Sequence, residues 1–260
     1  MYDLKITGGQ IHDGAGAEPV VADIAIKNGV IAAIGPDLGP AARTLDAAGK
    51  LVTPGFIDIH THYDGQASWD GMLRPSIDHG VTTAVMGNCG VGFAPVREAD
   101  HDKLIKLMEG VEDIPGTALH EGLTWDWESF PDYLDALAKI PRTIDIAAMV
   151  PHDPLRVYVM GDRAVHSEPA NDTDIAEMRR LTREALEAGA IGFATGRSDV
   201  HKTADGEWTP SSESTREELT GIARAFEGLG HGVVQAVSDF NLERREQELD
   251  EEWSIIADYA

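Results

Sequence analysis

The chain has 260 residues and a formal net charge of −24, from 45 acidic and 21 basic side chains. Such a surface repels phosphate backbones and anionic lipid headgroups, which argues against nucleic acid and membranes as partners. No apolar run approaches the roughly 20 residues of a membrane helix, and the N-terminus predicts a strand and not an export signal. The single cysteine, Cys89, can form no intramolecular disulfide. This fits a reducing compartment, so we expect a cytoplasmic location.

Residues 1–52 predict a small all-β module. Residues 4–7 alternate between apolar and polar side chains, and the alternating runs 22–26 and 30–34 flank an Asn-Gly pair. An Asn-Gly pair between two such runs is typical of a β-hairpin. A module of this size needs a partner to bury its apolar face. We therefore expect the N-terminal part of a small β-sandwich.

The remaining residues, 53–260, alternate between short apolar runs and helical patterns. The apolar runs are typical of strands buried on both faces of a parallel sheet, and the alternation implies right-handed βαβ units. The expected strands are residues 54–60, 81–86, 144–150, 190–194 and 233–237. The expected helices are residues 102–108, 132–138 and 174–188, a helix that begins at a capping box at 214–217 and ends at Gly230, and residues 242–259.

This pattern contains about five strand-helix units. A closed barrel of such units needs eight strands, whereas an open doubly wound sheet can stop at five. The count alone therefore does not decide between a partial barrel and an open sheet, and the residues at the strand ends must.

The first chemical motif is His60-Thr61-His62, at the end of the strand expected at residues 54–60. Side chains alternate along a strand, so both imidazoles point the same way. Two such imidazoles can hold one metal ion, with zinc–nitrogen bonds of about 2.0–2.1 Å. The alternative is that they are two surface histidines in a loop.

The second motif is Gly87-Asn88-Cys89-Gly90, at the end of the next expected strand. A lone cysteine usually packs as a small core residue. Beside a His-x-His pair, however, a thiolate is a tight zinc ligand, with a zinc–sulfur bond of about 2.3 Å. We therefore expect His60, His62 and Cys89 to share a site for Zn²⁺, with one or two ions.

An apolar strand that ends in His-x-His and follows an all-β module resembles the start of an amidohydrolase-superfamily protein. Gly-Asn-Cys-Gly after Gly-Val-Thr-Thr resembles the N-acyl-D-amino-acid deacylase (D-aminoacylase) branch, and segments 151–156 and 189–196 extend the resemblance along the chain. The resemblance implies an α/β fold in which residues 53–260 form a partial TIM-type (β/α)₈ barrel. It also implies a zinc-dependent hydrolase of carbon–nitrogen bonds other than peptide bonds, acting on a small N-acyl amino acid or a related amide.

The chain also departs from that branch. Members of the D-aminoacylase branch look as if they place a zinc-binding histidine after strand five. Here the aligned residue is Val237, which cannot bind metal. The loop at residues 197–206 differs from the Pro-rich segment of simple D-aminoacylases. In relatives the catalytic base is an aspartate after strand eight, which we expect beyond residue 260. The sequence therefore indicates the N-terminal portion of a divergent member, with its catalytic residue unassigned.

Three further residues are candidate substrate contacts. His152 follows the third expected strand, where it is placed to contact substrate, to support a metal ligand or only to stabilise a turn. Arg197 and His201 follow the fourth strand. An arginine fork suits a substrate carboxylate, whereas the alternative for both residues is solvated loop polarity.

Two other functions stay open at this stage. One is a non-catalytic binding or scaffold protein that kept the fold, which the valine at position 237 favours, and the other is a hydrolase of a cyclic amide. A nicotinamide-dependent oxidoreductase is disfavoured because no Gly-x-Gly-x-x-Gly follows the first strand. The sequence leaves the oligomeric state, including a homo-oligomer, open.

Overall fold

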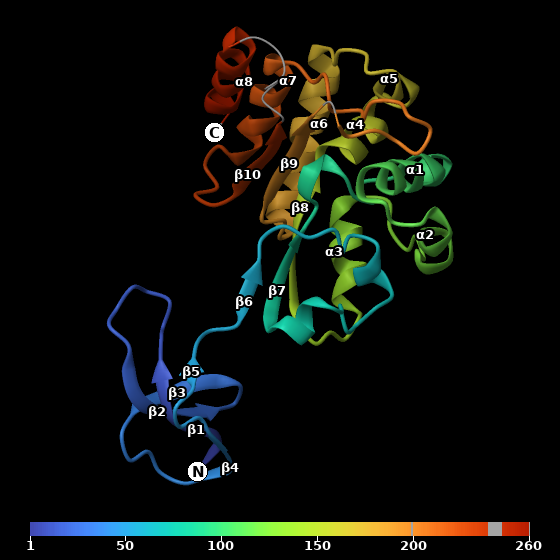
Figure 1. Cartoon of the computed structure of the whole chain (residues 1–260). Helices are drawn as coiled ribbons and strands as arrows, with labels where there is room; N and C mark the ends of the chain where they lie inside the picture. Colours follow the sequence, from blue (N-terminus) through green and yellow to red (C-terminus); the bar gives the residue numbers. More distant parts are fainter. Residues whose placement is uncertain (199, 239–245, 260) are drawn as a thin grey trace. The chain divides into compact units, whose positions relative to one another are not determined.

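The computed structural model describes residues 1–198, 200–238 and 246–259 of the chain. They fall into two compact units, Met1–Phe56 and Ile57–Ala260 (Figure 1). Among the described residues, no helix is long and apolar enough to cross a membrane.

The first unit is one five-stranded mixed sheet with the order β3-β2-β1-β4, in which β5 also pairs with β1. The expected hairpin is present, because β2 and β3 pair antiparallel and Asn28 and Gly29 between them have φ of 54° and 77°. Two positive φ angles give the turn the twist of its strands. The second sheet that a sandwich needs stays a prediction. The strands are β1 (Tyr2–Ile11), β2 (Val20–Lys27), β3 (Val30–Gly35), β4 (Ala41–Asp46) and β5 (Leu51–Val52).

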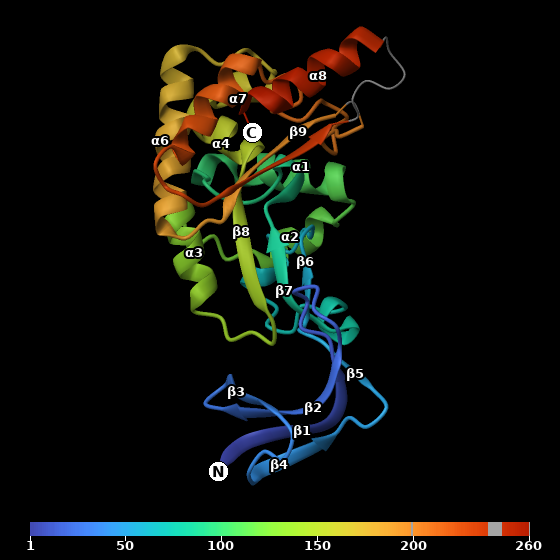
Figure 2. The same cartoon turned by 90° about the vertical axis from the view of Figure 1, so that its left-hand side faces the viewer.

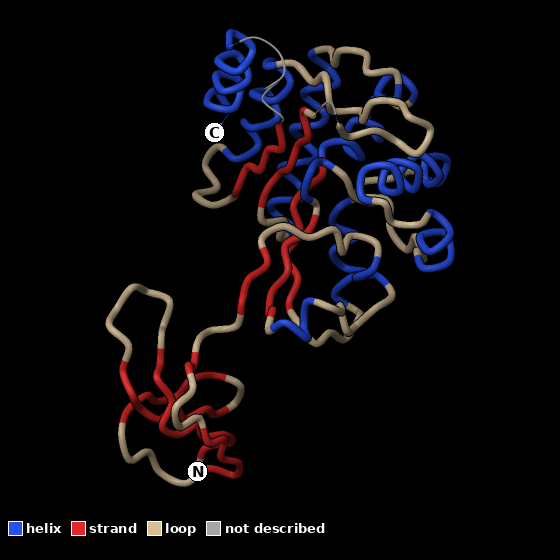
Figure 3. The backbone as a smooth tube through the Cα atoms, viewed as in Figure 1, coloured by secondary structure: helices blue, strands red, loops and turns tan. Residues whose placement is uncertain are grey.

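The second unit is built on a five-stranded sheet with the order β10-β9-β8-β7-β6. Each strand lies beside its neighbour in the chain, and β7–β8, β8–β9 and β9–β10 pair in parallel (Figure 3). A doubly wound sheet reverses its strand order part-way, so this sequential order is that of a β/α barrel. The strands are β6 (Phe56–Asp58), β7 (Val81–Met86), β8 (Asp145–Pro151), β9 (Gly192–Arg197) and β10 (Val233–Ser238).

The two faces of this sheet are packed differently. Along β7, Ala84 and Met86 belong to the main core, together with residues of the helices. Val85, which points to the opposite face, packs in a small separate cluster with Met149 and Ala194 from the next two strands. The main core therefore lies between sheet and helices, and the small cluster occupies the face that becomes the interior when such a sheet closes into a barrel.

Eight α-helices accompany the sheet in the described part of the chain. Among them α3, α6, α7 and α8 contact one another in that order, and α6 to α8 lie side by side in Figure 2. The helices are α1 (His101–Glu112), α2 (Gly116–Gly122), α3 (Phe130–Ala138), α4 (His152–Met160), α5 (Asp162–Val165), α6 (Asp172–Ala188), α7 (Arg216–Ala223) and α8 (Glu246–Tyr259).

Several helix predictions need correction. The segment after β8, expected to be a strand end and loop, is helix α4, and α2 and α5 were not expected. The helix predicted to start at 214–217 has Thr215 as its N-cap, with the Thr215 side chain accepting from the Glu218 N–H. Leu219 and Ile222 lie on the buried face of this helix. The helix ends at Ala223, not Gly230, and passes into a 3-10 turn. Residues 242–245 of the last expected helix lie outside the described residues.

Candidate metal centre

The structure brings His60, His62 and Cys89 together at the carboxyl ends of β6 and β7. Their ligand atoms all lie within 4.8 Å of one another. His60 Nε2 is 3.2 Å from Cys89 Sγ, which is 3.6 Å from His62 Nε2. Neighbouring ligand atoms of a tetrahedral zinc ion with N and S donors are about 3.3–3.6 Å apart, as its bond lengths require. The donor set and the two nitrogen–sulfur distances therefore fit one zinc ion, and the 4.8 Å spread of the whole group would narrow when an ion binds.

Local hydrogen bonds hold the two ligand-bearing segments against each other. The Thr61 N–H and hydroxyl both donate to Val85 O, at 2.9 and 2.7 Å. The buried Asn88 amide donates to Thr61 O at 3.1 Å and to Val85 O at 3.0 Å. Thr61 lies between the two histidines and Asn88 precedes the cysteine. These bonds therefore fix the distance between the imidazoles and the thiol.

Cys89 has a constrained backbone. Its φ is 56°, between Gly87 and Gly90 with φ of 85° and 80°. A Cβ on Gly90 would lie 3.0 Å from the backbone nitrogen of Gly196, so this turn packs directly against the end of β9. A non-glycine residue in the left-handed region costs about 1 kcal/mol or more. Such a conformation persists where the surrounding structure requires it, and here it places the thiol beside the histidines.

The electrostatics suit metal binding with proton release. Burial lowers the pKa of His62 to about 4, and the nearby His60 and His201 add to this effect, so the imidazole is in its neutral, ligating form. Burial raises the pKa of the Cys89 thiol to about 12, and the carboxyl groups of Glu112, Asp64 and Asp153 raise it further. The thiol therefore keeps its proton until a cation takes its place.

Two acidic residues beside the centre were not expected from the sequence. Glu112 Oε1, at the end of α1, lies 3.1 Å from His62 Nε2, and burial raises the Glu112 pKa to about 7. Asp64 is buried, its pKa is raised by burial to about 8, and its Oδ2 has no hydrogen-bond partner among the described residues. Asp64 continues the alternation of His60 and His62, which is a signal in the sequence. Glu112 has no such signal.

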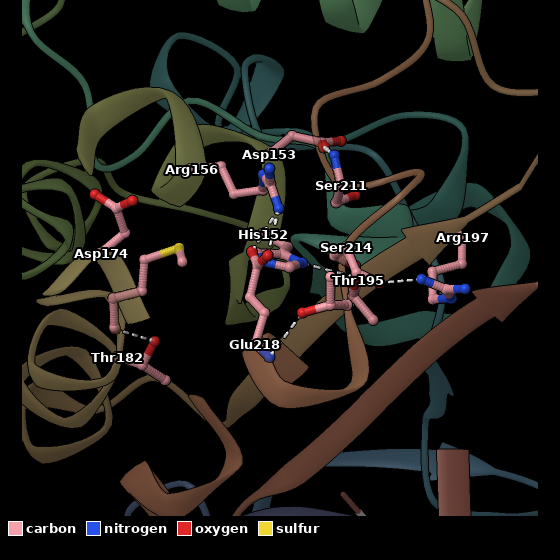
Figure 4. A network of polar contacts seen from close by, with 12 residues as sticks. His152, Asp153, Arg156, Asp174, Thr182, Thr195, Arg197, Ser211, Ser214 and Glu218 are labelled. Atoms are coloured by element: carbon pink, nitrogen blue, oxygen red, sulfur yellow. Dashed lines mark hydrogen bonds and ion pairs between the residues drawn. The ribbon is translucent and has the colours of Figure 1, made fainter. Parts of the chain in front are cut away.

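His152 is fully buried in a polar network (Figure 4). Its Nδ1 lies 2.8 Å from Thr195 Oγ1 and its Nε2 lies 2.9 Å from Glu218 Oε1. The buried Arg156 donates to both oxygens of Glu218, at 2.7 and 2.5 Å, and to Glu168 O. Both nitrogens of His152 therefore have protein partners, and a contact between His152 and substrate stays a prediction.

Arg197 and His201 lie at and beyond the end of β9. The Arg197 guanidinium forms a two-pronged pair with Glu252 of α8, at 2.5 and 3.1 Å, and also donates to Ser214 O. A substrate carboxylate would have to replace Glu252 to bind there. His201 lies nearer to the metal centre, because a Cβ on Gly196 would lie 2.4 Å from Cys89 O and 3.6 Å from His201 Nδ1. Substrate contacts of Arg197 and His201 stay predictions.

Comparison with known proteins identifies the family of this chain. A model of the amidohydrolase family matches residues 43–256. The chain belongs to the amidohydrolase family. Within it, D-aminoacylase of Alcaligenes xylosoxydans xylosoxydans is 36% identical over 236 residues, which is 90% of this chain and 44% of that protein. The resemblance to the D-aminoacylase branch is thereby confirmed.

Solved structures of the family agree. A crystal structure of D-aminoacylase superposes with a TM-score of 0.75 and 32% identity, over all of this chain and 50% of that one. N-acyl-D-glutamate deacylase from Bordetella bronchiseptica superposes with a TM-score of 0.71 and 30% identity, over 98% of this chain and 48% of that one. The chain therefore spans about half the length of these relatives.

Proposed function

We propose that this chain is the N-terminal portion of a zinc-dependent hydrolase that cleaves the amide bond of N-acyl-D-amino acids or related small amides. The observation that carries the proposal is the convergence of His60, His62 and Cys89 at one end of the parallel sheet. Active sites of β/α barrels lie at the carboxyl ends of the strands. Two imidazoles and one thiolate suit zinc better than they suit magnesium or calcium.

The family relatives support the substrate class. The Bordetella bronchiseptica deacylase binds zinc together with a phosphonate that mimics the tetrahedral intermediate of its reaction. D-aminoacylase has a binuclear metal centre in which one metal activates and the second attenuates. Three ligands on this chain suffice for one zinc ion, and a single metal ion activates that relative. A second ion would need donors in addition to these.

The residues of this chain have defined tasks in the proposed reaction. A bound zinc ion supplies Lewis acidity, which polarises an amide carbonyl and makes water acidic enough to attack at neutral pH. His60, His62 and Cys89 hold the ion, while Thr61 and Asn88 keep the three donors at their spacing. Proton transfer to the leaving nitrogen needs a general acid-base group. We assign that group to an aspartate beyond residue 260.

The edges of the sheet support the assignment of a longer protein. In the described part of the chain, β6 and β10 are edge strands of an unclosed sheet. Phe56, Ile57 and Ile59 on and beside β6 are 62–73% exposed, and Val233 on β10 is 55% exposed. Open apolar edges are unfavourable in a folded protein, and eight strands close such a barrel. Further strands would cover both edges and fill the interior face.

The position aligned with the missing zinc-binding histidine favours a second candidate function. Val237 lies in β10, paired with Gly196, and carries no donor atom. A non-catalytic family member that kept the fold and lost its chemistry would tolerate this valine. Such a protein has no need for zinc, so metal content together with turnover separates the two candidates.

The test compares this chain with a version extended through three more strand-helix units. Both are assayed on N-acyl-D-amino acids and cyclic amides, with the extended His62→Ala variant as control. We expect zinc-dependent turnover by the extended protein, and a rate lower by at least about 10²-fold for the 260-residue chain, because we assign the general base to an aspartate outside these 260 residues. Equal turnover by both would contradict the assignment of a longer protein. No turnover by the extended protein would favour the non-catalytic candidate.

A further inference from the structure

Two ligand-type atoms face the same nitrogen of His62. Glu112 Oε1 lies 3.1 Å from His62 Nε2, and Cys89 Sγ lies 3.6 Å from that nitrogen. A neutral imidazole has one N–H, so Nε2 can donate to at most one of the two groups. A cation among these atoms interacts favourably with all of them. Glu112 thus stands beside the group of His60, His62 and Cys89, and its carboxylate reaches that group at His62.

We propose that Glu112 is a direct carboxylate ligand of the metal ion held by His60, His62 and Cys89. This inference rests on the proposed function, because it concerns the same ion. The Glu112 Oε1 atom lies 3.1 Å from His62 Nε2. Two ligand atoms of one zinc ion, with bonds near 2.0–2.1 Å, lie about 3.3 Å apart. Among the described residues, no other carboxylate lies within ion-pair distance of either histidine.

The charge of the shell also supports a carboxylate. Two neutral imidazoles and one thiolate carry a charge of −1, which leaves a bound Zn²⁺ ion with an excess of +1. Cys89 is buried and His62 is largely buried, and an unbalanced charge in such a place is unfavourable. The carboxylate of Glu112 makes the site neutral. It supplies a fourth protein donor where the residue aligned with the family histidine is Val237, and the reacting water would then be a fifth ligand, a coordination number that catalytic zinc sites reach.

The fold holds Glu112 in place at the end of α1. The helix packs its Leu104 and Met108 into the main core. A Cβ on Gly110 would lie 2.2 Å from the backbone of Thr203, so the last turn of α1 lies directly against that loop. The helix ends at Glu112, and its C-cap Asp113 has a φ of 55°. These contacts leave the Glu112 side chain 20% exposed and its carboxylate beside His62.

The test measures metal binding and not activity. Zn²⁺ affinity is determined by competition with a chromogenic chelator, and Co²⁺ is used to record the thiolate-to-metal charge-transfer band and the d–d bands. The proteins are the wild-type 260-residue chain, Glu112→Gln, Cys89→Ser and Glu121→Gln. Glu121, exposed on the neighbouring helix α2, gives a matched change of charge outside the centre. Circular dichroism of the metal-free proteins reports whether each variant is folded.

We expect Glu112→Gln to weaken Zn²⁺ binding by at least about 10–100-fold, since even partners outside the ligand shell are worth that much. It should keep the charge-transfer band, which Cys89→Ser should lose, and change the d–d bands. Glu121→Gln should match the wild type. Wild-type affinity and d–d bands in Glu112→Gln would overturn the assignment of Glu112 while leaving the three-residue centre intact. A wild-type chain without metal binding or without the charge-transfer band would overturn both.

Discussion

The buried pair of Arg156 and Glu218 gives the sharpest prediction of stability. Both side chains are at most 1% exposed, and Arg156 donates to both carboxylate oxygens. The variant Glu218→Leu removes the counter-charge and leaves the guanidinium with Glu168 O as its remaining partner among the bonds described. It also removes the carboxylate partner of His152 Nε2. Removal of one partner of a buried ion pair costs about 3–5 kcal/mol. For a chain of this size that corresponds to a melting temperature lower by roughly 6–20 °C.

The assay is urea unfolding followed by the fluorescence of the five tryptophans. The double variant Arg156→Met/Glu218→Leu serves as the control, because it removes both charges and keeps similar volume. We expect it to recover part of the lost free energy of unfolding, since an apolar replacement of a buried pair is often neutral, while the unpaired His152 Nε2 still costs about 1–3 kcal/mol. A loss below about 1 kcal/mol in Glu218→Leu would refute the reasoning. So would a double variant as unstable as the single one, because the cost would then come from packing or from the unpaired His152 and not from the lone guanidinium charge.

Two further predictions follow from buried polar groups. Burial raises the pKa of Asp153 to about 7 although the Ser211 N–H donates to its Oδ1 at 2.6 Å. The unfolded pKa is about 3.9, so between these values the folded state holds a proton that the unfolded state has released, and stability falls as pH rises. The free energies of unfolding of Asp153→Asn and the wild type are compared with chelator present. The variant should become more stable relative to the wild type by about 3 kcal/mol as the pH rises from 5 to 8. A difference that stays constant across that range would contradict this. Asn88→Ala removes two hydrogen bonds to backbone carbonyls, so it should lower stability by about 1–3 kcal/mol and zinc affinity by about 10–100-fold. Unchanged affinity would mean that Asn88 does not set the ligand spacing.

Local patterns predicted much of the fold. The strand at Val81–Met86 has the bounds expected from its sequence, because its ends are marked by glycines on both sides. The hairpin at Asn28 was predictable for the same kind of reason, since its turn demands particular residues. Helix α4 was missed because its residues are buried nearly all round, from His152 to Met160, and so show no amphipathic pattern. Pro154 in its first turn is tolerated there, but it also suggested a loop.

The candidate centre was predictable only in part. His60, His62 and Cys89 carry their signal in local spacing at strand ends, and the structure brings these three together. Glu112 and Glu218 are brought to their histidines by tertiary packing, from 50 and 66 residues away. Short-range patterns contain no information about such contacts. Arg197 was predicted to meet a carboxylate, and the carboxylate beside it in the structure belongs to Glu252 of the same chain.

The most direct test of the metal centre is X-ray absorption at the zinc K-edge, on the chain purified after growth with zinc. The spectrum should show about one zinc ion per chain, with one sulfur neighbour at about 2.3 Å and nitrogen or oxygen neighbours at about 2.0–2.1 Å. The sulfur contribution should vanish in Cys89→Ser, since Cys89 is the single cysteine. A zinc shell without sulfur, or a chain that retains no zinc, would contradict the central claim that His60, His62 and Cys89 hold the ion.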